Sequence, residues 1–96
     1  DARALNLGAI ASARQGQKEQ GLEWARRALA VDPEDSGMLY NTACFFAVQG
    51  ERAEALDCLE KAVNFGFGLR GWIQNDADLM SLHGDPRFEA IVQRLG

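Results

Sequence analysis

The chain repeats itself with a period of about 34 residues, and this feature restricts its possible folds more than any other. When the sequence is shifted by one such period, many residues meet identical ones. The identical pairs are Leu5 and Leu39, Ala9 and Ala43, Ala13 and Ala47, Gln15 and Gln49, Gly16 and Gly50, Leu22 and Leu56, and Ala28 and Ala62. A repeat of this length is typical of arrays in which one supersecondary unit stacks on the next.

Each repeat carries the pattern of two helices separated by a tight turn. We expect first helices at about 2–14 and 36–49, and second helices at about 18–31 and 52–64. Apolar residues in the second helices recur at i, i+3, i+6 and i+7, three or four residues apart along one face, which is the stripe of an amphipathic helix. The stripes are Leu22, Ala25, Ala28 and Leu29, then Leu56, Leu59, Ala62 and Val63. The sequence therefore predicts an all-α fold.

Glycine, proline and aspartate mark the ends of these helices. Gly16 and Gly50 occupy the turns, where a residue free to adopt positive φ ends a helix at low cost. Pro33 stops the second helix of the first unit, and Asp35 or Ser36 is placed to cap the helix that follows.

These residues resemble a tetratricopeptide repeat, which has the same 34-residue period and small residues where its helices cross. The resemblance covers repeat one at about 2–35 and repeat two at about 36–67. Three positions depart from the pattern: Ser12 replaces an aromatic residue, Gly21 replaces alanine, and Phe67 stands where a proline usually closes the unit. The resemblance implies an α-solenoid of antiparallel helix pairs within a single domain, 1–96.

The remaining residues, about 68–96, differ from the repeats and are expected to form C-terminal capping helices. Asp85 and Pro86 are suited to the cap and first position of a last helix. Phe88, Ile91, Val92 and Leu95 give that helix one apolar face. Before it, we expect Trp72, Ile73, Leu79, Met80 and Leu82 to fold over the end of repeat two. The tail resembles the C-terminal end of tetratricopeptide arrays in bacterial multidomain proteins. With Asp1 as its first residue, we expect the chain to be a piece of a longer protein.

In the family, the first helices of successive units line a groove that holds a partner. The resemblance places the following residues there: Arg3, Asn6, Leu7, Ile10, Ala13, Arg14, Tyr40, Asn41, Cys44, Ala47 and Val48. Such a groove suits an extended or helical peptide with apolar anchors and an acidic group. Ile10 and Cys44 occupy places where a carboxylate clamp would need polar or basic side chains, so we predict no clamp of that kind.

Two interpretations of this surface stay open. It is either a groove for another protein or peptide segment, or a face packed on other parts of its own full-length chain or on a second copy. The first makes the chain a non-catalytic scaffold for protein–protein interaction. The second makes it a regulatory or oligomerisation appendage of a larger bacterial enzyme or transcription regulator.

Composition narrows the possible partners. The net charge of −4 argues against a nucleic-acid partner, which requires clustered Lys and Arg. No apolar run is long enough to cross a membrane. Cys44 and Cys58 lie in predicted helices among apolar neighbours, which indicates reduced core thiols and favours a cytoplasmic location.

No group of residues has the spacing of a catalytic, cofactor or metal site. His83 stands alone in a predicted loop, and with two cysteines it lacks the paired spacing of structural zinc. Asp76 and Asp78 are too few for a calcium loop, and helix capping accounts for them better. Trp24 and Trp72 are interpreted as packing residues. We therefore expect neither an enzyme nor a bound cofactor or metal.

Overall fold

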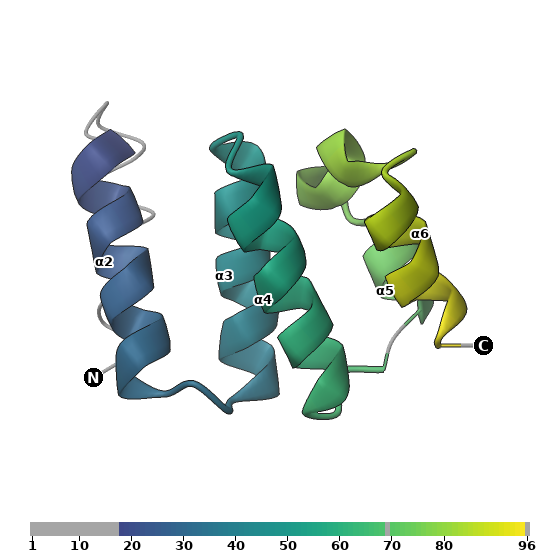
Figure 1. The fold of residues 1–96 in the computed structure, drawn as a ribbon, viewed down its shortest axis with the longest axis horizontal. Helices are drawn as coiled ribbons and strands as arrows, with labels where there is room; N and C mark the ends of the chain where they lie inside the picture. Colours follow the sequence, from purple (N-terminus) through teal and green to yellow (C-terminus); the bar gives the residue numbers. More distant parts are fainter. Residues whose placement is uncertain (1–17, 69, 96) are drawn as a thin grey trace.

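The computed structural model describes residues 18–68 and 70–95, and these residues form helices joined by short turns (Figure 1). The helices are α2 (Lys18–Val31), α3 (Ser36–Val48), α4 (Arg52–Asn64), α5 (Arg70–Asn75), the 3₁₀ helix η1 (Ala77–Leu82) and α6 (Pro86–Gln93). The described part of the chain contains no strand, so the predicted all-α class is confirmed there. None of the described helices has both the length and the apolar character needed to cross a bilayer.

The bounds of α2, α3 and α4 agree closely with those predicted from the sequence. The predicted first helix at about 2–14 lies outside the described residues. Asp35 caps α3 by accepting a hydrogen bond from the Met38 amide. It is one of the two residues, Asp35 and Ser36, that the sequence placed at this cap. Gly50 takes φ +82° after α3, as the turn assignment requires.

A glycine with positive φ also ends α4, so this helix ends without the proline that usually closes such a unit. Gly66 adopts φ +112°, the Gly66 amide donates to the Val63 carbonyl, and the Phe67 amide donates to the Ala62 carbonyl. This pair of bonds is a Schellman motif, which satisfies the last carbonyls of a helix without proline. The turn directs Phe67 back onto Tyr40, and the two rings stack with centroids 4.2 Å apart.

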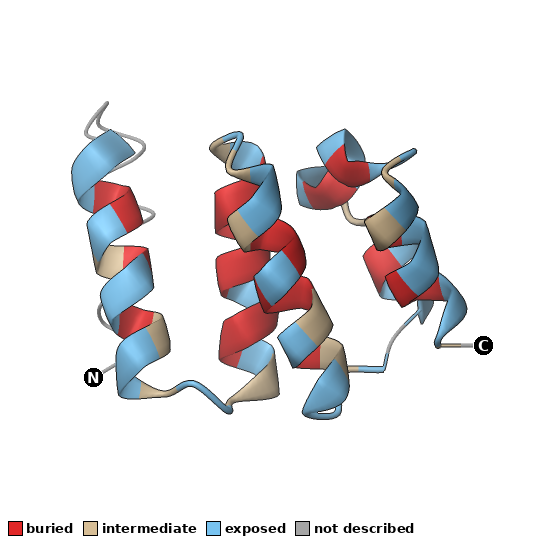
Figure 2. Cartoon of the chain, in the orientation of Figure 1, coloured by how far each residue is buried: buried red, intermediate tan, exposed pale blue. Residues whose placement is uncertain are grey.

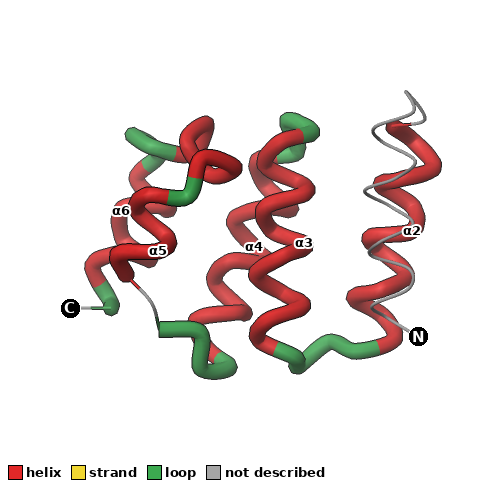
Figure 3. The backbone as a smooth tube through the Cα atoms, turned by 180° about the vertical axis from the view of Figure 1, so that it is seen from behind, coloured by secondary structure: helices red, strands yellow, loops and turns green. Residues whose placement is uncertain are grey.

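The helices form two layers (Figures 1 and 3). We call α3, α5 and η1 the first-helix layer, and α2, α4 and α6 the second-helix layer. In Figure 1, α4 lies in front of α3 and α6 in front of α5, and Figure 3 shows the reverse order from behind. Polar bonds run along the second-helix layer. Arg26 of α2 binds Glu54 of α4, and Arg87 of α6 binds Asp57 and Glu60 of α4.

The C-terminal group, formed by α5, η1 and α6, keeps the spacing of the repeats. The second-layer helices α4 and α6 begin at Arg52 and Pro86, which are one repeat period apart. Gly84 has φ +88° and is the repeat equivalent of Gly50, which has φ +82°. The tail that the sequence set apart from the repeats therefore follows the same register.

The core runs continuously from α2 to α6, and Figure 2 shows buried residues on each of these helices. Helix α3 is buried on most of its circumference, because α2, α4 and η1 all pack against it. The C-terminal group adds Ile73, Leu79, Leu82, Phe88, Ile91 and Val92 to this core. The prediction that the tail folds over repeat two is thus confirmed for Ile73, Leu79 and Leu82. It is wrong for Trp72 and Met80, which are 61% and 57% exposed.

Candidate functional site

The residues predicted to line a groove separate into three sets. Arg3, Asn6, Leu7, Ile10 and Arg14 lie outside the described residues, as does Ala13. Asn41 and Val48 of α3 are exposed on the first-helix layer. Tyr40 and Cys44 are instead only 4% and 7% exposed, and Ala47 is also buried, because the C-terminal group packs over this part of α3.

Tyr40 holds the C-terminal group to α3. Its hydroxyl donates a 2.5 Å hydrogen bond to Oδ2 of Asp76, and its ring stacks on Phe67 with an angle of 7° between the planes. Burial raises the pKa of the Tyr40 phenol, and the bond to the Asp76 carboxylate raises it further. The phenol therefore remains a hydrogen-bond donor throughout the neutral range. Tyr40 thus joins α3 to the C-terminal group, and little of its surface is left for a partner.

Asp76 occupies the point where the first-layer helix of the C-terminal group is interrupted. Its backbone is extended, with φ −72° and ψ 119°, between the end of α5 and the start of η1. Its Oδ1 accepts the Asp78 amide and so caps η1, as the sequence predicted for these aspartates. The interruption turns the remaining oxygen, Oδ2, toward Tyr40 and Cys44 of α3.

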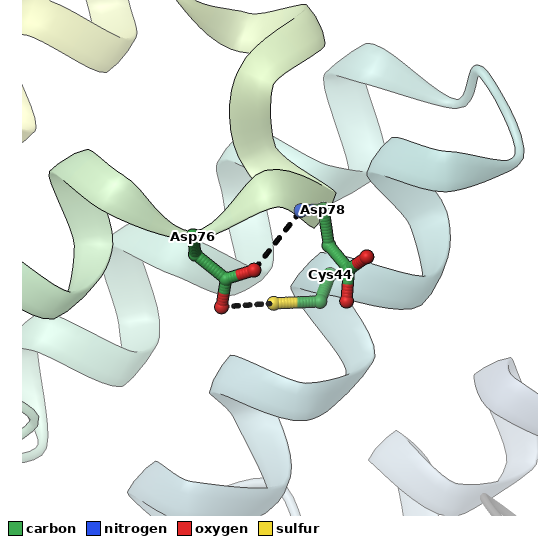
Figure 4. A group of neighbouring side chains, drawn as sticks. All are labelled: Cys44, Asp76 and Asp78. Atoms are coloured by element: carbon green, nitrogen blue, oxygen red, sulfur yellow. Dashed lines mark hydrogen bonds between the residues drawn. The ribbon is translucent and has the colours of Figure 1, made fainter.

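Cys44, Asp76 and Asp78 come together at this point (Figure 4). Their potential ligand atoms lie within 4.8 Å of one another, and the Cys44 thiol donates a long hydrogen bond of 3.7 Å to Asp76 Oδ2. Sequence spacing missed this cluster, because Cys44 and Asp76 belong to different units and are far apart along the chain. Only the 34-residue register, applied to the tail, places Asp78 at the position equivalent to Cys44.

The cluster is a set of hydrogen bonds that connect α3 to the C-terminal group. Burial raises the pKa of the Cys44 thiol to about 12, and the negative charge of Asp76 adds to the effect. A thiol acts as a nucleophile or a metal ligand in its thiolate form. A cation held by this sulfur and the two carboxylates would have to displace the thiol proton and compete with the Tyr40 hydroxyl for Asp76.

Three other residues singled out in the sequence pack against their neighbours. Cys58 is buried in α4, and burial raises the pKa of its thiol to about 12, so the prediction of two unpaired core cysteines is confirmed. The His83 ring stacks on Phe88 with centroids 5.0 Å apart, while the residue itself is exposed. Trp24 is partly buried against the core, as expected of a packing residue.

Trp72 is the exception, and it stands beside a hollow in the surface. The hollow has a volume of about 350 Å³ and is lined by Trp72, Asn75 and Asp76. Asn75 occupies the repeat position equivalent to that of Asn41, and both asparagines are exposed. The Asn75 side-chain amide donates to the Gly71 carbonyl one turn earlier, which leaves its own carbonyl oxygen as an acceptor. An aromatic side chain, two asparagines and a carboxylate are thus among the accessible chemical groups of this layer.

Comparison with known proteins returns no matching family model and no matching solved structure. The fold and the site therefore have to be interpreted from the chain's own residues. The described residues are all-helical, and α4 and α6 begin 34 residues apart.

Proposed function

We propose that this chain is a non-catalytic protein-interaction module of the tetratricopeptide type, a solenoid that binds a segment of another polypeptide along its first-helix layer. The observation that carries the proposal is the recurrence of an exposed asparagine at one repeat position. Asn41 on α3 and Asn75 on α5 are separated by one repeat period and lie in the same layer. Asparagine offers a donor and an acceptor, so a row of them can hydrogen-bond the backbone of an extended segment.

The distribution of the other side chains supports a binding role over a chemical one. The two thiols are buried with raised pKa values, so neither is activated as a nucleophile. His83, the single histidine of the chain, packs on a phenylalanine ring. By contrast, Trp72 and Val48 are 61% and 60% exposed on the first-helix layer. Exposed aromatic and aliphatic side chains of this kind are typical anchors of protein–protein contacts.

A selection from a random peptide library displayed on phage tests the proposal directly. The full chain is immobilised, and enriched peptides are synthesised and titrated against it in solution. Replacing both asparagines, Asn41→Ala with Asn75→Ala, should weaken binding at least about tenfold, since two backbone hydrogen bonds of about 1 kcal/mol each are lost. The control is Glu23→Gln, an exposed residue of the second-helix layer. Failure to enrich any peptide over an unrelated helical protein would rule the proposal out.

The second candidate is a regulatory or oligomerising appendage whose apolar side chains meet a second copy or another part of its own protein. The exposure of Val31, Val48, Phe65, Trp72 and Met80 favours it, since each is a large apolar side chain near half exposed or more. Solution mass over a range of concentrations distinguishes the two. A concentration-dependent dimer supports the appendage, and a monomer at all concentrations supports the peptide-binding module.

A further inference from the structure

We propose that the hollow beside Trp72 receives a lysine or arginine side chain of the bound segment, with the cationic head between the indole ring and the carboxylates of Asp76 and Asp78. This inference rests on the proposed function, since it specifies which residue of the bound polypeptide is recognised. Three features carry it: the exposed indole, the shape of the hollow and the distribution of charge.

The indole of Trp72 is exposed on a helix that is itself firmly placed. Its neighbour Ile73 is fully buried in the core, and α5 packs against both η1 and α6. Two residues before it, Arg70 begins the helix on a different side, because i and i+2 do not share a helix face. Trp72 is therefore held at the surface by its helix, and its indole is available to a partner without rearrangement of the core.

The hollow has the dimensions of a side-chain site. Its volume of about 350 Å³ is near the lower end of the range for ligand pockets, about 300–1,000 Å³. It is open to solvent and lined by Trp72, Asn75 and Asp76, which follow one another at helical spacing along one short segment. Such an open site, with an indole, an amide and a carboxylate in its lining, suits a long side chain that enters from a neighbouring polypeptide.

The charges around the hollow favour a cation. Asp76 is half-buried and Asp78 is exposed, and they lie at one end of η1. Among the described residues of α3, α5 and η1, Arg70 is the single basic residue. The other described basic residues belong to the second-helix layer: Lys18, Arg26, Arg27, Arg52, Lys61, Arg87 and Arg94. Of these, Arg52 reaches the first-helix layer at the carbonyl of Ser81, near the opposite end of η1.

An arginine or lysine head in this hollow would interact with the indole face and with the carboxylates at the same time. A cation over a tryptophan ring is attracted by the ring quadrupole, and tryptophan is the best aromatic partner for it. The half-buried position of Asp76 reduces the screening of its charge by salt. A partner's carboxylate would meet like charge here. The described part of the layer thus selects a basic residue, in contrast to the acidic group that Arg3 and Arg14 led us to expect from the sequence.

The peptides selected from the random library provide the test. We expect them to share a lysine or arginine, and replacement of that residue by norleucine should weaken binding about tenfold. Trp72→Ala and Asp78→Asn should each remove most of that difference, while Glu23→Gln, which removes the same charge from the second-helix layer, should leave it intact. Both positions are exposed, and circular dichroism of each variant checks that the fold is retained.

The outcomes separate the two proposals. Peptides that depend on Asn41 and Asn75 but have no shared basic residue, or that bind Asp78→Asn and Trp72→Ala as well as the parent chain, would overturn this inference alone. A library from which nothing is enriched would overturn the peptide-binding function and this inference with it. Titrations in the presence of a metal chelator must give the same affinities; a loss of binding there would assign the carboxylates to a metal ion instead.

Discussion

The hairpin of α3 and α4 and the C-terminal group of α5, η1 and α6 are two versions of the same design. Both place a first-layer element against a second-layer helix, and the second-layer helices begin at Arg52 and Pro86, one repeat period apart. The first is continuous, with 13 residues in α3 and 13 in α4. In the second, the first-layer helix is divided at Asp76, and α6 has 8 residues.

At Asp76 the first-layer helix is interrupted, and side-chain hydrogen bonds to the neighbouring unit replace the backbone hydrogen bonds of a continuous helix. Thr42, the residue of α3 equivalent to Asp76, is fully buried, and its hydroxyl donates to the Met38 carbonyl within the same helix. Asp76 leaves the helix and binds Tyr40 of the preceding unit. The comparison indicates that the regular hairpin is stabilised mainly from within, whereas the C-terminal group depends on its contact with α3. The exposed Trp72 and the hollow beside it both belong to the irregular C-terminal group.

The largest expected effect on stability comes from removing one buried aromatic ring from each region. Phe46 of α3 and Phe88 of α6 are both essentially fully buried. We expect Phe46→Ala and Phe88→Ala each to lower the free energy of unfolding by about 3–5 kcal/mol, with a single transition in both cases. Urea denaturation followed by circular dichroism measures this. The milder Phe→Leu variants remain measurable if the alanine variants do not fold.

Two well-separated transitions in the Phe88 variant, but not in the Phe46 variant, would contradict the continuous core. They would mean that the C-terminal group unfolds by itself. Phe65→Ala is the matched control, because Phe65 is 48% exposed and its removal should cost less than about 1 kcal/mol.

The next test compares the two equivalent positions at which the regions differ. Asp76→Ala removes the cap of η1 and leaves the buried Tyr40 hydroxyl without its acceptor, so we expect a loss of about 2–3 kcal/mol. Thr42→Val removes one hydrogen bond, from the Thr42 hydroxyl to the Met38 carbonyl in the same continuous helix, and should cost about 1 kcal/mol or less. Equal losses at the two positions would show that the break at Asp76 has no special role.

A double-mutant cycle isolates the bond itself. Tyr40→Phe should be destabilising in the parent chain and nearly neutral in the Asp76→Ala background, with a coupling free energy of about 1.5–3 kcal/mol for a hydrogen bond to a charged group. Additive effects would mean that Tyr40 contributes through its ring stacking on Phe67 alone.

These comparisons show what the sequence could predict. The helical period and the punctuation by glycine and proline were sufficient for α2, α3 and α4, because both depend on residues within one turn or two of each other. The capping roles of Asp35, Asp76 and Asp85 are equally local, and each side chain accepts the amide two or three residues later.

The remaining features depend on contacts between units. An amphipathic pattern predicts that a face is covered but does not identify the segment that covers it, so the burial of Tyr40 by the C-terminal group was missed. Trp72 was expected to pack because of its size, yet Ile73 beside it takes the core position of that turn. The register of the tail was missed because Asp76 and the short α6 obscure it, although Asn41 and Asn75 and the pair Gly50 and Gly84 obey it.

A smaller effect is expected from raising the pH by one unit above the value at which an unfolded thiol ionises, about pH 8.5. The thiols of Cys44 and Cys58 keep pKa values of about 12 in the folded chain, while an unfolded thiol ionises near about pH 8.5. Between these values the unfolded state binds fewer protons, so stability is complete below about pH 8.5 and falls as the pH rises. The loss is at most about 1.4 kcal/mol per pH unit for each thiol. Tyr40, whose pKa burial also raises, adds to the loss above about pH 10.

Single replacements assign this loss to the two thiols. Cys44→Ala and Cys58→Ala should each give a shallower decline of unfolding free energy with pH. Asp76→Asn should reduce the contribution of Cys44 and leave that of Cys58, because the Asp76 charge raises the pKa of Cys44 and does not act on Cys58. An alkaline decline unchanged in the double cysteine variant would assign it to other groups.

The smallest effect is expected in the second-helix layer, where α2 and α6 each contact α4 through exposed ion pairs. Arg26 joins α2 to Glu54, and Arg87 joins α6 to Asp57 and Glu60, all through side chains at least about one-third exposed. Since solvent screens such pairs, Arg26→Met and Arg87→Met should each cost less than about 1 kcal/mol at low salt and almost nothing in about 1 M salt. A loss at Arg87 that persists in high salt and exceeds that of Asp76→Ala would reverse the comparison. It would mean that the second-helix layer, and not the contact of Tyr40 with Asp76, holds the C-terminal group in its register.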